Sequence, residues 1–336
     1  SGLLHRINLD AIPLSETETL ADRYHFYRLN STRQLVIPDD VKIVNNDAVL
    51  YGGIQFDQDT IPSENGSYLA SRSEVKSSAQ TLDSTSRGGS WNFLSGTERE
   101  VNSIEEIMKS TGFQAILKKA KAATEESFKN IGAHNFPSPR ILHLATHGYF
   151  FPDPHQANSA KRGMTQDSAS GERTATAALS KPKFQSETKE TIFQLSDHPM
   201  LRSGLIFAGG NAAWQGKQTL EGREDGVLTA YEISQLDLSN TELVVLSACE
   251  TGLGDIEGNE GVYGLQRAFK IAGVKYIIMS LWQVPDKQTS LLMTTFYKKF
   301  LEAEGPDKGG NKMSIPNAFH AAQKELRDIG LDPYQW

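Results

Sequence analysis

Apolar residues occur in two patterns along this chain, as short continuous runs and as longer stretches with helical spacing. The short runs are β-branched or aromatic and are bounded by polar or turn-forming residues, which is typical of buried strands. These runs lie at 35–37, 48–56, 140–148, 242–248 and 276–282. Helices are predicted, most clearly where apolar residues recur every third or fourth position, at 98–108, 124–130, 229–235, 261–271, 289–301 and 315–329.

The order of these elements predicts the architecture. Strands that alternate with helices form a mainly parallel sheet with helices on both faces, and near-continuous apolar runs fit strands that are buried on both sides. We therefore expect an α/β fold. In such sheets the functional groups gather just beyond the carboxyl ends of the strands.

Two long stretches, at about 57–90 and 153–191, have little periodic apolar content and are rich in Ser and Thr. Segments of this composition bury too little surface to offset the entropy lost on ordering. We predict that both are mobile insertions in a single domain spanning 1–336. Because the chain does not begin with Met, we also expect it to be a fragment of a larger protein.

Composition narrows the functional classes. The 336 residues include 34 Lys and Arg against 41 Asp and Glu, a formal net charge of −7, which argues against direct binding of nucleic acid. We find no run of about 18 apolar residues, so we expect no membrane-spanning helix. The one cysteine cannot form an internal disulfide, which fits a reducing compartment, and we expect a cytoplasmic protein.

That single cysteine, Cys249, directly follows the apolar run 242–248, and His147 stands near the end of the run 140–148. Both residues are thus expected at the carboxyl edge of the sheet. An imidazole can take the proton of a thiol, and the resulting thiolate attacks a peptide carbonyl. We predict a catalytic dyad of Cys249 and His147, with the N–H groups of Gly148 and Cys249 in the oxyanion hole. No sequence pattern identifies a third member.

Six segments, taken together and in their order, resemble the CHAT domain family, a caspase-like cysteine protease module associated with tetratricopeptide repeats. The similar segments are His143–Gly148, Arg202–Leu205, Asp225–Ile233, Glu242–Gly252, Glu260–Ala268 and Ser280–Val284. The resemblance implies the caspase-type sheet with His147 and Cys249 as its dyad. It also implies a protein substrate, a regulatory tetratricopeptide-repeat region as a partner, and a role in bacterial-type signalling or defence.

The chain departs from the caspase signature around the cysteine. Ser247 and Glu250 replace the signature residues on either side of Ala248-Cys249, which argues against strict cleavage after Asp. The dyad residues are 249 − 147 = 102 positions apart, and the stretch 153–191 accounts for much of this separation. The family usually continues past an element like 333–336, so we expect a last strand to be missing or supplied elsewhere.

The resemblance also places the substrate along the strand at 276–282, because caspase-like enzymes pair an extended peptide with that strand edge. Ser280 and Trp282 are the candidate substrate-binding residues there, although Trp282 fits a core position equally well. Asp225 and Asp286 lie near predicted loop ends, where an acidic pocket would favour a basic residue before the cut. The alternative for each is an acidic loop exposed to solvent.

We expect no metal and no other cofactor. His143 and His147 are four residues apart, but the run is strand-like, and Leu144 stands where a zinc-protease helix requires Glu. His143 is therefore interpreted as a hydrogen-bonded core residue. The rival functional hypothesis is a non-catalytic interaction module with the same fold, and a second rival is a protease that stays inactive until a missing regulator engages.

Overall fold

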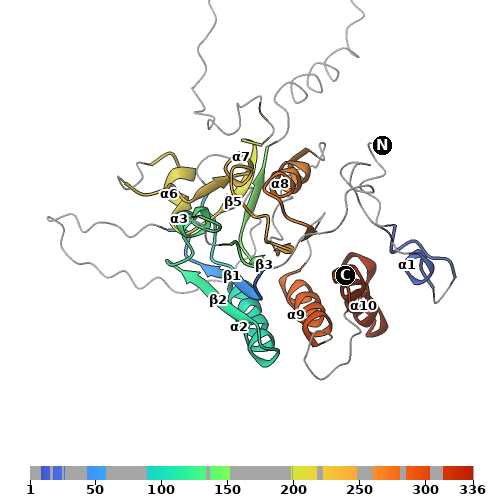
Figure 1. Cartoon of the computed structure of the whole chain (residues 1–336). Coiled ribbons are helices and arrows are strands. Elements are labelled where there is room, and N and C mark those ends of the chain that lie inside the picture. The colour runs from blue at the N-terminus through green and yellow to red at the C-terminus, as the bar shows by residue number, and fades with distance from the viewer. Residues whose placement is uncertain are drawn as a thin grey trace, which may run out of the picture.

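The computed structural model describes residues 9–15, 18–24, 26, 44–57, 89–133, 137–151, 198, 200–217, 222–247, 260–280, 285–302 and 313–335. Within them, five parallel strands form the main sheet in the order β2-β1-β3-β7-β8 (Figure 1). Their bounds are Asp47–Ile54 for β1, Gln114–Ala120 for β2, Ile141–Leu144 for β3, Leu243–Leu246 for β7 and Tyr276–Met279 for β8.

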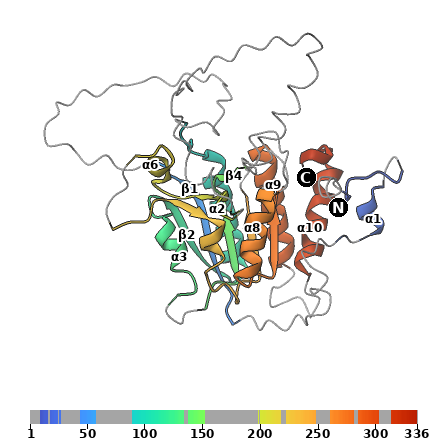
Figure 2. The same ribbon diagram turned by 90° about the horizontal axis from the view of Figure 1, so that it is seen from above.

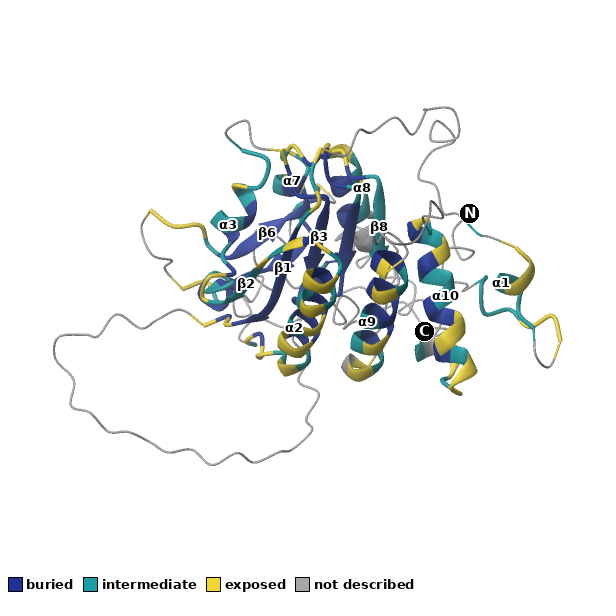
Figure 3. Cartoon of the chain, turned by 60° about the horizontal axis from the view of Figure 1, so that its bottom comes forward, coloured by how far each residue is buried: buried dark blue, intermediate teal, exposed yellow. Residues whose placement is uncertain are grey.

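Helices cover both faces of this sheet, as Figures 1 and 3 show. One face carries α2 (Ser95–Ser110) and α9 (Asp286–Glu302), and α10 (Ile315–Asp328) packs beside α9, with its buried side in the same core. The opposite face carries α3 (Glu125–Lys129), α7 (Ala230–Ile233) and α8 (Glu260–Ile271). The predicted α/β architecture with a parallel sheet between helices is confirmed.

The two cores follow from the alternation of side chains along each strand. In β1, Ala48 and Leu50 pack toward α2 and α9, whereas Val49 and Tyr51 pack toward α3. The strand β7 divides in the same way between its odd and even positions. Every second residue of a central strand therefore enters a different core, which explains why the runs are apolar throughout.

A second, antiparallel sheet stands beside the first, in the order β4-β5-β6. Its strands are β4 (Gly148–Phe150), β5 (Ser203–Ile206) and β6 (Val227–Thr229), and β5 is followed by the short helix α6 (Gly210–Trp214). The sequence did not indicate this sheet. The structure also corrects the predicted strand at 140–148: β3 ends at Leu144, and Gly148 begins the separate strand β4, which pairs with β5.

The segment that contains α1 (Leu20–Arg23) lies beside the helix α10 (Figure 2). Asp22, in α1, accepts two hydrogen bonds from the Arg327 guanidinium in α10, at 2.7 and 2.8 Å. The hydrogen bond from Arg327 holds the pKa of the Asp22 carboxyl well below its usual range. The chain closes with the short helix η3 (Pro333–Gln335).

The structure tests the remaining predictions of helices, strands and mobile stretches only in part. All six predicted helices are present, with ends that differ by a few residues. The predicted strand at 35–37 and the stretch 153–191 lie outside the described residues, and so does most of 57–90. No helix in the described part of the chain is both long and apolar enough to cross a membrane.

Candidate active site

His147 lies beyond the carboxyl end of β3, in a turn that is tied to both sheets. Ala145 N–H donates to the carbonyl of Tyr51 in β1 (2.8 Å), and the Thr146 hydroxyl donates to the carbonyl of Ile206 in β5 (2.5 Å). Ile206 N–H donates in turn to the His147 carbonyl (2.9 Å). These three bonds hold the turn rigidly at the predicted edge of the parallel sheet.

The imidazole ring of His147 is enclosed by aromatic side chains. The rings of Phe56 and Trp91 each lie 4.9 Å from it between centroids, and only 1% of His147 is exposed. Its Nε2 lies 2.8 Å from the backbone carbonyl oxygen of Asn92. A carbonyl oxygen can only accept a hydrogen bond, so Nε2 carries the proton, and Nδ1 is the basic nitrogen of the neutral ring.

The Asn92 carbonyl is a site group that the sequence did not reveal. It belongs to the segment just before α2, 55 residues from His147 in the chain. A backbone carbonyl is present at every position, so no residue type signals this role. The neighbouring Trp91, which follows a long polar stretch and is buried, is a local signal that the segment returns to the core.

The structure constrains the position of Cys249 only through β7, the strand that precedes it in the chain. Leu144 of β3 pairs with Leu246 of β7 in parallel register, and Ser247 N–H donates to the Leu144 carbonyl at 3.0 Å. His147 follows its member of this pair by three residues, and Cys249 follows the other by three. Cys249 itself lies outside the described residues.

Gly148, the predicted oxyanion donor, is the first residue of β4 and is buried. It pairs with Leu205 of β5, one step along from the hydrogen-bonded pair of His147 and Ile206. Bonded and non-bonded pairs alternate in an antiparallel ladder. The N–H of Gly148 therefore points away from β5, on the edge of the sheet that has no further strand among the described residues.

Of the candidate substrate-binding residues Ser280, Trp282 and Asp286, the structure describes the side chain of Ser280 alone. Ser280 is half-buried and directly follows Met279, which pairs with Leu246 in β7, so it lies at the same carboxyl edge of the sheet as the His147 turn. Asp286 is the first residue of α9, but its side chain is outside the described part. Trp282 lies outside the described residues altogether.

Asp225 belongs to a cluster of charged groups between α3, α7 and the loop before β6. Its carboxyl accepts a hydrogen bond from Val227 N–H (2.8 Å) and shares a hydrogen bond with Glu125. Burial raises the pKa of Asp225, and burial raises that of Glu125, which is 1% exposed, to about 7. Both shifts have the same first cause, because loss of hydration in the protein interior disfavours the charged form of a carboxyl group.

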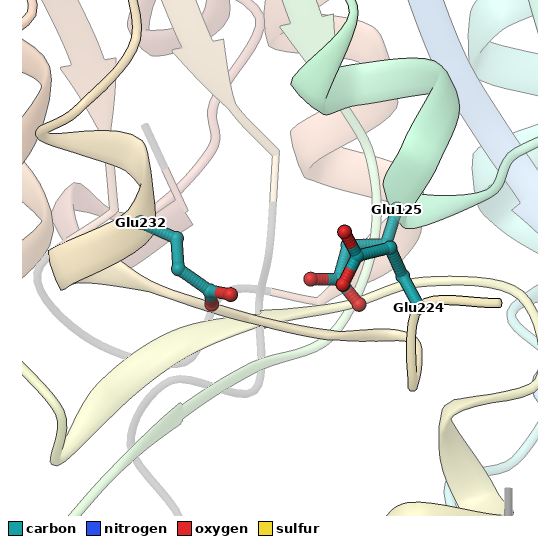
Figure 4. A group of neighbouring side chains, drawn as sticks. All are labelled: Glu125, Glu224 and Glu232. Carbon is teal, nitrogen blue, oxygen red and sulfur yellow. The ribbon is translucent and has the colours of Figure 1, made fainter. Parts of the chain in front are cut away.

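Three carboxylates of this cluster, those of Glu125, Glu224 and Glu232, converge on one space (Figure 4). Their spacing would suit a cation. Instead, the Lys129 ammonium contacts all three, at 2.7, 2.9 and 2.8 Å respectively. The cluster is therefore an ion-pair network that ties α3 to the loop before β6 and to α7.

His143 meets the interpretation made from sequence. It is fully buried in β3 on the face opposite that of His147's aromatic neighbours, with Nε2 3.0 Å from a Glu100 carboxylate oxygen in α2. Its Nδ1 lies 3.3 Å from the Tyr297 hydroxyl in α9. The residue joins two helices to the sheet and has no place beside the predicted dyad.

A parallel sheet between two helical layers, with a histidine held just beyond a central strand, defines a caspase-like α/β module. The CHAT domain family matches the chain over residues 1–336, and the protein belongs to that family. A segment of 75 residues is 35% identical to Tetratricopeptide repeat protein 28 of Mus musculus. This segment makes up 22% of the chain and only 3% of the length of that relative.

Proposed function

We propose that the protein is a cysteine endopeptidase that cleaves a protein partner with Cys249 as the nucleophile and His147 as its base. The observation that carries this proposal is the parallel register of β3 and β7. The dyad residues each follow a paired residue, Leu144 or Leu246, by three positions. Two neighbouring parallel strands of equal reach would bring the thiol and the imidazole to the same edge of the sheet.

The tautomer of His147 supports a specific first step. With the Nε2 proton donated to the Asn92 carbonyl, Nδ1 is the ring nitrogen that would take the thiol proton of Cys249. The thiolate then forms a bond to the carbonyl carbon of the scissile peptide. The carbonyl oxygen becomes the oxyanion, and N–H donors in its vicinity typically stabilise it by a few kcal/mol each, roughly 3 kcal/mol for one donor.

The later steps use the same groups. The imidazolium of His147 gives its Nδ1 proton to the leaving amine as the carbon–nitrogen bond breaks, and an acyl-enzyme remains. Water, deprotonated by the same nitrogen, attacks the thioester carbonyl and restores the thiol. We assign the oxyanion donors to the N–H groups of Gly148 and Cys249, and the outward direction of the Gly148 N–H supports its part.

Substrate binding is proposed along β8. An extended peptide would lie against the strand edge near Ser280 and Trp282, with Asp225 and Asp286 as candidate acidic groups for a basic residue before the cut. The inward hydrogen bonds of Asp225 mean that its loop would have to open for this role. We further propose one domain over 1–336 with insertions at 57–90 and 153–191, and control by a tetratricopeptide-repeat region.

Alkylation of Cys249 tests the dyad directly, because the only cysteine makes the product unambiguous by intact mass. We expect the rate at which iodoacetamide alkylates Cys249 in the wild type to stay high well below pH 8.5. An ordinary thiol, with a pKa of about 8.5, would react slowly there because little of it is thiolate. His147→Gln should shift the profile toward that ordinary value. His198→Gln, which removes an exposed histidine, is the matched control and should leave the profile unchanged.

Cleavage is tested with a peptide library and with candidate partner proteins. The wild type should cut and Cys249→Ala should not. Cleavage that survives in Cys249→Ala would refute the assignment of the nucleophile. A thiol that is inert in the wild type and unaffected by His147→Gln would instead favour the interaction module.

A further inference from the structure

Asn211, the second residue of α6, is a buried residue whose side-chain amide and backbone N–H are directed at two other chain segments. Its Oδ1 accepts from Trp91 N–H (2.7 Å), and its Nδ2 donates to the Trp91 carbonyl (3.1 Å). The same Nδ2 donates to the Asp57 carboxylate (2.8 Å), and the backbone N–H of Asn211 donates to the Phe56 carbonyl (3.0 Å). Only 3% of the residue is exposed.

The two hydrogen bonds from the Asn211 side chain restrain rotation of the Trp91 backbone about both of its dihedral angles. One side chain holds both the N–H and the carbonyl of the same residue, so the next residue, Asn92, has a fixed starting direction. It is the carbonyl of Asn92 that accepts from His147 Nε2 at 2.8 Å. The Trp91 ring is supported as well, since it packs 5.0 Å from Trp214 on the same short helix and 4.9 Å from the His147 ring.

The helix that carries Asn211 is itself held tightly. A Cβ atom at Gly210 would come within 2.6 Å of the Gly226 carbonyl oxygen and 2.8 Å of the Ile206 side chain. This close approach sets the start of α6 directly against β5, the strand whose Ile206 also bonds to the His147 backbone. The strand β5 therefore bonds to the His147 backbone, and the helix α6 packed against it holds the segment that carries the Asn92 carbonyl.

We propose that Asn211 is a positioning residue for the dyad: it holds the Asn92 carbonyl in place and so selects the Nε2-protonated tautomer of His147, in which Nδ1 is the base. The inference rests on the proposed function for its catalytic consequence. Its structural content, the tautomer, can be measured in a protein that cleaves nothing.

An amide is required at this position for a chemical reason. Trp91 N–H needs an acceptor, while the Trp91 carbonyl and the Asp57 carboxylate need donors, and one amide supplies both. Asn211→Asp would turn a second carboxylate oxygen toward two acceptors, one of them charged. Alanine would leave all three groups without their partner.

The chain also offers a matched control. Asn240 is a buried asparagine that makes the same kind of clamp: its Oδ1 accepts from Val44 N–H (2.8 Å), and its Nδ2 donates to the Ser138 carbonyl (2.6 Å) and to Asn45 Oδ1 (3.0 Å). It precedes β7, so it stands at the opposite, amino edge of the parallel sheet. Asn240→Asp should destabilise the fold comparably without reaching His147.

The test is 15N NMR of protein labelled selectively at histidine, with the His147 signals assigned by their loss in His147→Gln. In the wild type above pH 8 we expect widely separated nitrogen shifts, with the proton on Nε2. In Asn211→Asp the two shifts should move toward each other as the tautomers interconvert, while Asn240→Asp should retain the wild-type pattern. If cleavage is established, Asn211→Asp should lower kcat about 10-fold or more with little change in KM, within the roughly 10²–10⁴-fold contribution of a general base.

The outcomes separate the two proposals. A Nδ1-protonated His147 in the wild type, or an unchanged tautomer in folded Asn211→Asp, overturns the role of Asn211 whether or not the protein is a protease. A tautomer shift in a protein whose thiol is inert upholds the positioning of His147 and rejects the hydrolase. If Asn211→Asp does not fold, the role of Asn211 is decided by the His147 tautomer in the wild type and in the milder variant Asn211→Ser.

Discussion

Replacing Glu125 by Gln removes an ionisable group from the ion-pair network between α3 and the loop before β6. The carboxyl accepts a hydrogen bond from Gly226 N–H (2.8 Å) and contacts Lys129 (2.7 Å), yet burial, with added repulsion from Asp225 and Glu232, raises its pKa from 4.5 to about 7. The amide of Gln can keep the bond from Gly226. The variant therefore tests the cost of burying the charge.

The sign follows from the direction of the shift. A carboxyl whose pKa is higher in the folded than in the unfolded protein favours folding fully below pH 4.5, and this contribution is lost as the pH rises through about 7. The whole shift corresponds to about 3 kcal/mol, at about 1.4 kcal/mol for each pKa unit. Between pH 5.5 and pH 8 the loss amounts to about 2 kcal/mol.

Urea denaturation at these two pH values measures the effect. We expect Glu125→Gln to become more stable relative to the wild type by about 2 kcal/mol at pH 8 compared with pH 5.5. The matched control is Glu224→Gln, which removes a carboxylate from the same Lys129 but at an exposed position. Its effect should be small and nearly equal at both values. If the difference in the free energy of unfolding between Glu125→Gln and the wild type is equal at pH 5.5 and pH 8, or changes in the opposite direction, the reasoning is refuted.

Three further predictions concern packing and hydrogen bonds. Thr146→Val removes the hydroxyl that donates to the β5 carbonyl and should cost about 1–3 kcal/mol by urea denaturation, whereas Thr146→Ser should retain most stability; equal losses would contradict the role of the hydroxyl. Phe207→Ala empties a fully buried position and should cost about 3–5 kcal/mol, against a clearly smaller loss for Phe207→Leu. Asp22→Asn weakens the bidentate contact with Arg327, so limited proteolysis within 9–24 should accelerate, while Asp328→Asn, at a more exposed neighbour, should cleave at the wild-type rate.

Secondary structure could be predicted where local composition decides it. The strands β1, β3, β7 and β8 are apolar because both their faces are buried, and the long helices show the spacing of a single buried side. The strand β2 was missed because it is an edge strand: Ile116 is 53% exposed, and Lys118 and Lys119 interrupt the apolar run. The strands β4 and β6 have three residues each, too few for a period to appear.

The sequence by itself determined the four doubly buried strands β1, β3, β7 and β8, and it placed His147 just past one apolar run and Cys249 just past another, because burial on both faces leaves a local mark. Only the tertiary structure decided which nitrogen of His147 carries the proton. That choice depends on a backbone carbonyl 55 residues away and on an Asn211 clamp that joins positions 120 residues apart. Backbone groups are the same at every residue, so their partners are selected by the packing of the whole fold and leave no mark in the local sequence.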